Sequence, residues 1–237
     1  MTTLTESNSF FSGRRKLGKL IVLEGIDGSG KSSQYRRVCE RLDADGIPFS
    51  HIVFPRYNKE SSALVRLYLE GAFGSKPGDV NAYTASTFFA VDRFASYRDD
   101  WGETYHNGGL ILSDRYTTSN VIHQGSKLPN EELPAFFAWL GDLEFNKMLL
   151  PRPDLVIYLD TTVEISLARM KRRQDRTGTH ADIHEKDPSY LEKCLHTANL
   201  ACDYFGWHRI SCLDESGNER ALEEKNDEIY ALVQSVL

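Results

Sequence analysis

The chain has 237 residues, of which 41% are hydrophobic, and this is enough to bury one sizeable core. Its formal net charge of -6 provides no overall attraction to polyanions, so we expect neither nucleic acid nor a membrane surface as a partner. The apolar stretches are of strand length, well below the roughly 18 residues that a membrane-spanning helix needs.

Residues 1–18 are rich in Ser and Thr and carry the basic trio Arg14, Arg15 and Lys16, without the apolar region of a secretory signal. We interpret them as a flexible extension that precedes a single domain over residues 19–237. The four cysteines show neither C-x-x-C nor zinc-binding spacing. That pattern favours reduced, partly buried thiols and a cytoplasmic location.

The first predicted element is a short buried strand over residues 20–23, and G-I-D-G-S-G-K-S follows it at residues 25–32. This sequence fits the P-loop pattern G-x-x-x-x-G-K-[ST] in its proper place after a strand. Glycines allow backbone N–H groups to turn inward around phosphate oxygens. The residues expected at the nucleotide phosphates are Gly25, Asp27, Gly28, Ser29, Gly30, Lys31, Ser32 and Ser33.

A helix predicted over residues 31–42 would direct its positive end at the same phosphates. Lys31 adds a full positive charge near the β- and γ-phosphates, and the Ser32 hydroxyl is expected to bind Mg²⁺.

Further apolar runs predict strands over 51–54, 110–113 and 155–159, with a weaker one over 207–213. Between them, amphipathic patterns predict helices over 62–70, 82–98, 131–149, 163–173 and 189–204. Alternating strands and helices favour an α/β fold built from right-handed βαβ units, with a parallel sheet flanked by helices. Ligands of such sheets bind beyond the carboxyl ends of the strands.

Polar residues follow the predicted strands at that edge. Asp114 ends the third strand, where P-loop proteins place a carboxylate that holds Mg²⁺. Arg115 follows directly, and a guanidinium can bind two phosphate oxygens at once. We therefore expect phosphate chemistry at the carboxyl edge of the sheet.

Four motifs follow one another along the chain: E-G-I-D-G-S-G-K-S-S-Q at 24–34, F-P-R-Y at 54–57, F-F-A-V-D-R at 88–93 and D-R-Y-T-T-S-N at 114–120. Together they resemble the thymidylate kinase family over about residues 19–206. The resemblance implies a nucleoside-monophosphate-kinase fold with a five-stranded parallel sheet and a short lid. It also implies phosphoryl transfer from Mg·ATP to dTMP, giving dTDP, by a homodimer.

The resemblance implies roles for residues around the dTMP sugar and phosphate. Asp27 corresponds to a carboxylate beside them, Phe54 and Pro55 to a pair against the sugar, and Arg56 lies near the position of an arginine that touches the phosphate. Tyr116 is expected to pack against the ribose.

The same resemblance implies that Phe89 stacks on thymine and that Arg93 donates to thymine O4. The spacing i, i+4 places both side chains on one face of a helix. Ser119 and Asn120 resemble the residues that bind the edge of the base. His123 stands where the family commonly has a tyrosine, which leaves the selection against a 2′-hydroxyl open.

Residues 169–187 resemble the mobile lid of the family. The segment starts with a basic cluster, Arg169, Lys171, Arg172, Arg173 and Arg176. We expect Arg173 and Arg176 to reach the transferred phosphoryl group, alongside Lys31, Arg115 and Asp27 as catalytic residues. Asp182, His184 and Glu185 lack zinc-binding spacing, and we interpret them as contact residues at the end of the lid.

Two other classes of function remain open on the sequence. A deoxynucleoside kinase, or a kinase for another pyrimidine nucleoside monophosphate, would share the P-loop architecture. A nucleotide-dependent switch would share it too, but would leave the motif at 88–93 unexplained. A nucleoside kinase needs a carboxylate base after the second strand, where this chain has Phe54-Pro55-Arg56.

Overall fold

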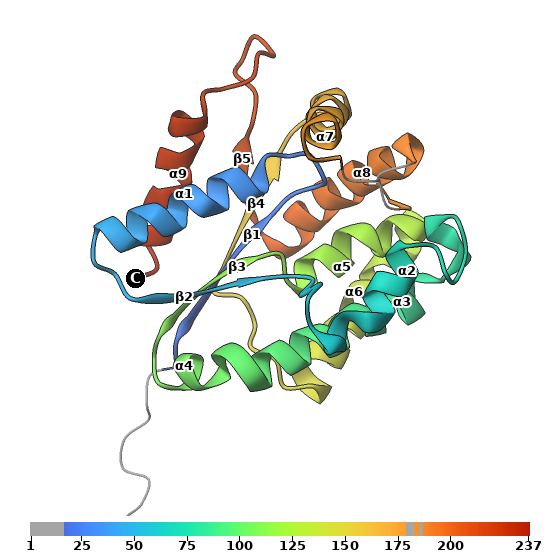
Figure 1. Ribbon diagram of the computed structural model, residues 1–237, viewed down its shortest axis with the longest axis horizontal. Coiled ribbons are helices and arrows are strands. Elements are labelled where there is room, and N and C mark those ends of the chain that lie inside the picture. The colour runs from blue at the N-terminus through green and yellow to red at the C-terminus, as the bar shows by residue number, and fades with distance from the viewer. Residues whose placement is uncertain (1–16, 179–182, 185–186) are drawn as a thin grey trace, which may run out of the picture.

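The computed structural model describes residues 17–178, 183–184 and 187–237. Within them, one parallel sheet has the strand order β2-β3-β1-β4-β5 (Figure 1). The strands are β1 (Lys19–Glu24), β2 (Phe49–Val53), β3 (Leu110–Asp114), β4 (Leu155–Asp160) and β5 (His208–Ser211). The prediction of a five-stranded parallel α/β sheet is confirmed. β1 lies at its centre, so the loop after β1 is at the middle of the carboxyl edge.

The sheet is buried on both faces because its strands carry apolar side chains in both directions. From β1, Ile21 and Leu23 contribute to the core on one face, which α1 (Lys31–Ala44) and α9 (Leu222–Gln234) cover. Figure 1 shows these two helices together on that side. Leu20 and Val22 contribute to the core on the opposite face.

Several helices cover that opposite face (Figure 1). They are α2 (Ala63–Leu69), α3 (Ala82–Ser96), α4 (Gly102–His106), α5 (Thr117–His123), α6 (Leu133–Gly141) and α8 (Pro188–Phe205). Buried aromatic side chains such as Trp101 and Tyr116 join them to the sheet.

Short 3-10 and π turns connect these helices. The 3-10 turns are η1 (Glu60–Ser62), η2 (Pro77–Asp79), η4 (Gly125–Lys127) and η5 (Asn130–Glu132). The π turns η3 (Tyr97–Trp101) and η6 (Asp142–Lys147) continue α3 and α6. The predicted helices 82–98 and 131–149 are therefore each an α-helix that ends in a π turn.

Element boundaries differ from the predictions where the hydrophobic pattern is weak. β2 begins two residues earlier than the run 51–54, because it is an edge strand whose His51 and Val53 are exposed. α7 (Val163–Thr177) extends past residue 173 and ends at Gly178, whose φ of 65° suits a helix C-terminus. α4, α5 and α9 were not among the predicted helices.

Two predictions fall partly outside the described residues. Of the flexible extension predicted over residues 1–18, residues 1–16 are not described, and the predicted lid includes the undescribed residues 179–182 and 185–186, with Asp182 and Glu185 among them. Gly18 is described, and its N–H donates to the Tyr105 carbonyl at 2.7 Å. In the part of the chain that is described, no helix is long and apolar enough to cross a membrane.

Candidate functional site

The loop between β1 and α1 has the backbone of a phosphate cradle. Gly28 and Gly30 have φ values of 77° and 91°, in the left-handed region that favours glycine. A Cβ on Gly28 would overlap the backbone of Ser166, and one on Gly25 would overlap the Ser29 hydroxyl. The loop therefore needs its glycines both for conformation and for close packing.

The start of α1 can bind an anion. Its N-cap residue Gly30 provides no side-chain cap and its first turn contains no acidic residue, so the N–H groups of Lys31 and Ser32 keep their hydrogen-bonding capacity, while those of the next two residues donate to Gly30. Among the described residues, the buried Ser29 hydroxyl has no partner either. These unsatisfied donors fit the phosphates of a nucleotide.

Lys31, Ser32 and Asp114 meet beside the cradle. The Lys31 ammonium forms an ion pair with Asp114 Oδ1, and Ser32 Oγ lies 3.4 Å from Asp114 Oδ2. Burial lowers the pKa of Lys31. One hydroxyl and one carboxylate fit Mg²⁺, which takes few protein ligands and completes its shell with phosphate and water oxygens. The described residues contain no cluster of three acidic, His or Cys ligands.

A cavity of about 610 Å³ extends from the cradle to α7. Arg169, Arg173 and Arg176 line it from successive turns of α7, since the spacing i, i+4, i+7 places them on one face. The structure thus brings the two expected lid arginines to the cavity that the P-loop lines.

Arg169 has a further role that its position in a basic cluster did not predict. Its Nη1 donates to the carbonyl oxygens of Gly28, at 3.2 Å, and of Ser29, while Nη2 pairs with Glu219. It therefore ties the loop backbone to α7 and to the segment before α9.

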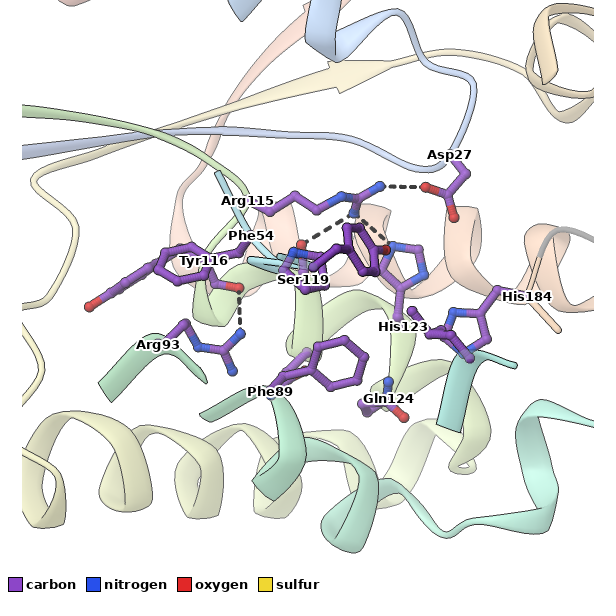
Figure 2. A pocket seen from close by; sticks show the side chains of 14 residues that line it. Asp27, Phe54, Phe89, Arg93, Arg115, Tyr116, Ser119, His123, Gln124 and His184 are labelled. Carbon is purple, nitrogen blue, oxygen red and sulfur yellow. Dashed lines mark hydrogen bonds and ion pairs between the residues drawn. The ribbon is translucent and has the colours of Figure 1, made fainter. Parts of the chain in front are cut away.

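A second cavity lies beside the first, and Arg115 is at its upper edge in Figure 2. The Arg115 backbone has a φ of 69°, which is strained for a residue with a side chain. Nη2 pairs with Asp27, while Nη1 contacts Ser119 Oγ at 3.2 Å and His123 Nε2 at 3.0 Å. Glu24, fully buried, also lies 3.4 Å from Nη1.

These contacts determine the charges around Arg115. Burial raises the pKa of Asp27, but the attraction of Arg115 and of other nearby positive groups outweighs it, so the pKa is below its usual value. Burial, and to a lesser degree the charge of Arg115, lowers the pKa of His123 to about 4. A guanidinium only donates, so His123 Nε2 accepts from Arg115 and the ring is neutral.

The far end of the second cavity is lined by aromatic and amide side chains. Phe89 and Arg93 approach from α3, and Gln124 approaches from the end of α5 (Figure 2). Asn120 of α5 lines the same cavity. Within the described chain, neither polar atom of the buried Gln124 amide has a hydrogen-bond partner. An amide in such a pocket fits a ligand that both donates and accepts.

The two cavities adjoin. Asp27, Phe54, Pro55, Tyr57 and Arg115 line both of them. A group held on one side of Arg115 and Asp27 therefore faces a group held on the other.

Most residues expected at the site lie in one of the two cavities. Those at the second are Asp27, Phe54, Pro55, Phe89, Arg93, Arg115, Tyr116, Ser119, Asn120 and His123. Those at the first include Asp27, Gly28, Ser29, Gly30, Lys31, Ser32, Ser33, Asp114, Arg173 and Arg176. Gly25 lines neither cavity, and its Cα packs so close to Ser29 that a Cβ there would overlap the Ser29 hydroxyl.

Arg56 lines neither cavity. Its guanidinium pairs with Asp92 at 3.2 Å and Asp100 at 2.6 Å, and donates to Ser61 Oγ at 2.9 Å. The structure thus places it in a network between the chain after β2 and α3–η3. The position after β2 correctly indicated a place near the site. The residue there that lines both cavities, however, is the next one, Tyr57.

Four residues at or beside the second cavity were not among the expected site residues, although His184 was expected as a contact at the end of the lid. Glu24 accepts from Thr118 and Ser119, both at 2.7 Å, and thereby joins β1 to α5. His184 stacks on His123, with ring centroids 5.8 Å apart and planes 8° apart. Glu144 and Gln124 are the others. Glu24 ends an apolar strand, and Glu144 lies in an otherwise largely apolar helical segment. An acid in such a place must find a buried partner, and this is the signal that could have identified both.

Comparisons with known proteins agree with this geometry. A sequence profile of the family "Thymidylate kinase" matches residues 23–202. The chain is 29% identical over 176 residues to a thymidylate kinase of Mycobacterium tuberculosis, covering 73% of this chain and 81% of that one.

Relatives with longer matches come from other organisms. A thymidylate kinase of Symbiobacterium thermophilum is 27% identical over 219 residues, which is 92% of this chain and 93% of that one. A protein of Pyrococcus horikoshii, named a probable thymidylate kinase, is 30% identical over 227 residues, covering 93% of this chain and 98% of its own length. The chain belongs to the thymidylate kinase family.

Proposed function

We propose that this protein transfers the γ-phosphoryl group of ATP to the 5′-phosphate of dTMP and so forms dTDP and ADP. The observation that carries this proposal is the pair of adjoining cavities with Arg115 and Asp27 at their boundary. A phosphate cradle lines one cavity, and an aromatic ring, a guanidinium and two amides line the other. Family membership supports the same conclusion.

On the ATP side, the loop amides and Lys31 hold the phosphates, and the cavity along α7 accommodates the rest of the nucleotide. Ser32 and Asp114 would hold Mg²⁺, which would offset the negative charge of the phosphates. Arg173 and Arg176 line this cavity and are positioned to stabilise the transferred group.

On the dTMP side, Phe89 packs on the base, while Arg93, Asn120 and Gln124 bind its polar edge. Arg115 binds the 5′-phosphate. Asp27 and His123 hold the Arg115 guanidinium from two sides, so binding requires little rearrangement of that side chain.

The reaction needs no strong general base. A dTMP phosphate oxygen is already anionic at neutral pH, and it attacks the γ-phosphorus as the bond to the ADP oxygen breaks. Positioning and charge neutralisation therefore supply the catalysis. A nucleoside kinase would instead need a free carboxylate near a 5′-hydroxyl, but Asp27, which lines both cavities, is paired with Arg115.

The test is ADP release from ATP in the presence of dTMP, thymidine, dCMP or no acceptor. We expect strong stimulation by dTMP and little by the others. Stimulation by thymidine but not by dTMP would favour a nucleoside kinase, and full turnover without an acceptor would favour a nucleotide switch.

We further propose that the protein works as a homodimer. The support is a set of exposed apolar side chains along α2 and α3, at positions that share a helix face: Leu64, Leu67, Tyr83, Val91 and Phe94. A second copy of this chain, with the same apolar surface, is the occupant we propose. Four free thiols are consistent with a reducing, cytoplasmic environment.

A further inference from the structure

Glu144 is a fully buried acid on η6, and it connects two polar side chains of the second cavity's wall, Arg93 and Asn120, with the nearby Thr117. Its carboxylate accepts two hydrogen bonds from Arg93, from Nε and from Nη2, both at 2.6 Å. Thr117 Oγ1 donates to it at 2.6 Å, and Asn120 Nδ2 lies 3.5 Å from it. Glu144 itself does not line the cavity, so it acts through these neighbours.

The carboxylate decides which edge of Arg93 faces a ligand. Because Nε and Nη2 are both bound to Glu144, Nη1 remains as the donor at the cavity, with one contact to the Tyr116 carbonyl at 3.4 Å (Figure 2). A terminal guanidinium nitrogen carries two N–H groups, so one is left for a base oxygen.

The same carboxylate helps to decide how the Asn120 amide is turned. Nδ2 donates to the Ser86 carbonyl at 3.1 Å and faces Glu144, so the nitrogen points away from the cavity. Oδ1 is the other end of the amide, and it is the atom left for a ligand in the cavity that Asn120 lines. Asn120 thus offers an acceptor beside the donor of Arg93.

We propose that Glu144 is a positioning residue that fixes this donor–acceptor order and thereby makes the site select thymine over cytosine. Thymine presents an acceptor at O4 and a donor at N3, which match Arg93 and Asn120. Cytosine presents an amine and an unprotonated N3, so donor would face donor and acceptor would face acceptor. The inference rests on the proposed function, because it takes dTMP as the acceptor substrate.

The experiment measures kcat/KM for dTMP and for dCMP in the wild type, Glu144→Gln and Asp142→Asn. Gln has the size of Glu but replaces one carboxylate oxygen with an amide nitrogen that faces the Arg93 donors. We expect the dTMP:dCMP ratio to fall by roughly tenfold or more, because a hydrogen bond to a charged group is lost and Asn120 can flip. The KM for dTMP should rise while that for ATP stays within about twofold, since the ATP cavity does not include Glu144.

Asp142→Asn is the matched control, because it removes the same charge from the same π turn at an exposed side chain. It should leave the ratio unchanged. If Glu144→Gln does not fold, Thr117→Val serves instead: it conserves volume, removes one donor to the carboxylate, and should lower the ratio by about threefold.

A folded Glu144→Gln protein with the wild-type ratio would overturn the proposal, as would an equal rise in both KM values, which indicates a general structural effect. An unchanged ratio in folded Thr117→Val would do the same. A wild-type protein that shows no turnover of dTMP would overturn the proposed function, and this inference with it.

Discussion

Arg115 occupies a strained backbone conformation at the boundary between the two cavities, and its side chain is held by Asp27, Ser119 and His123. Strain of this kind costs on the order of 1–3 kcal/mol and persists only where surrounding contacts impose it. Here the contacts direct one guanidinium to the place where the two substrates would meet.

Lys31→Ala should lower kcat on the order of 10²-fold or more, because it removes the ammonium that we propose binds the transferred phosphoryl group. Binding of dTMP, measured by calorimetry, should persist, since Lys31 lines only the first cavity. Near-normal turnover would remove Lys31 from the mechanism.

His123 makes folding stability depend on pH. Its pKa falls from 6.5 to about 4 in the folded protein, so between these values the unfolded chain binds a proton that the folded chain does not. This contribution is complete above pH 6.5 and is lost as the pH falls towards 4, by about 3 kcal/mol at most. Urea unfolding at pH 7, 5.5 and 4.5 measures it.

His123→Gln provides the comparison, because Gln can accept from Arg115 without titrating. Its stability should fall less steeply over the same pH range. Parallel pH profiles for the two proteins would show that His123 does not carry this dependence.

The motifs predicted most residues that line the cavities, because three of them follow strands and all four resemble those of a known family. Arg56 shows the limit of that reasoning, since a strand end does not say which of two adjacent side chains turns inward. Glu144 is distant in sequence from its partners and reaches them only through the packing of η6 against α3 and α5. Such a contact requires the tertiary structure.

At the scale of elements, hydrophobic runs predicted the buried strands well, since β1, β3 and β4 are apolar on both faces. The hydrophobic pattern of the edge strand β2 is weaker, because several of its side chains are exposed or only half-buried. α9 has a polar, acidic first turn and shows its apolar face only in Ile229, Tyr230 and Val233, which pack on the sheet. The tertiary structure is needed to show that α9 covers one face of the sheet.

α7 contacts the phosphate cradle through Arg169, which donates to two loop carbonyls. Arg169→Ala should loosen the loop and raise the KM for ATP by roughly 30-fold, the equivalent of about 2 kcal/mol for hydrogen bonds from a charged group. The KM for dTMP should change little. Steady-state kinetics with each substrate varied in turn measure both values.

Lys171→Ala is the control for this experiment, because Lys171 is an exposed cation on the same helix and lines neither cavity. Equal effects of the two substitutions would indicate that only the positive charge of α7 matters, and not the contact with the loop.

For the whole molecule, the exposed apolar surface on α2 and α3 predicts association. Phe94→Glu should shift the protein from dimer to monomer without unfolding it, because Phe94 is 41% exposed in the single chain. Sedimentation velocity measures the state, and circular dichroism verifies the fold. Leu149→Glu, at an exposed apolar side chain elsewhere, should leave the dimer intact. A wild-type protein that is monomeric at all concentrations would contradict the proposal.

The most direct test of the whole account is a crystal structure with dTMP and a non-hydrolysable ATP analogue bound together. We expect thymine against Phe89 with O4 near Arg93, the 5′-phosphate on Arg115, and the triphosphate in the loop of residues 25–32. The γ-phosphorus should face the dTMP phosphate across the boundary between the cavities. A nucleotide base bound away from Phe89 and Arg93, or a monophosphate turned away from the loop, would contradict the account.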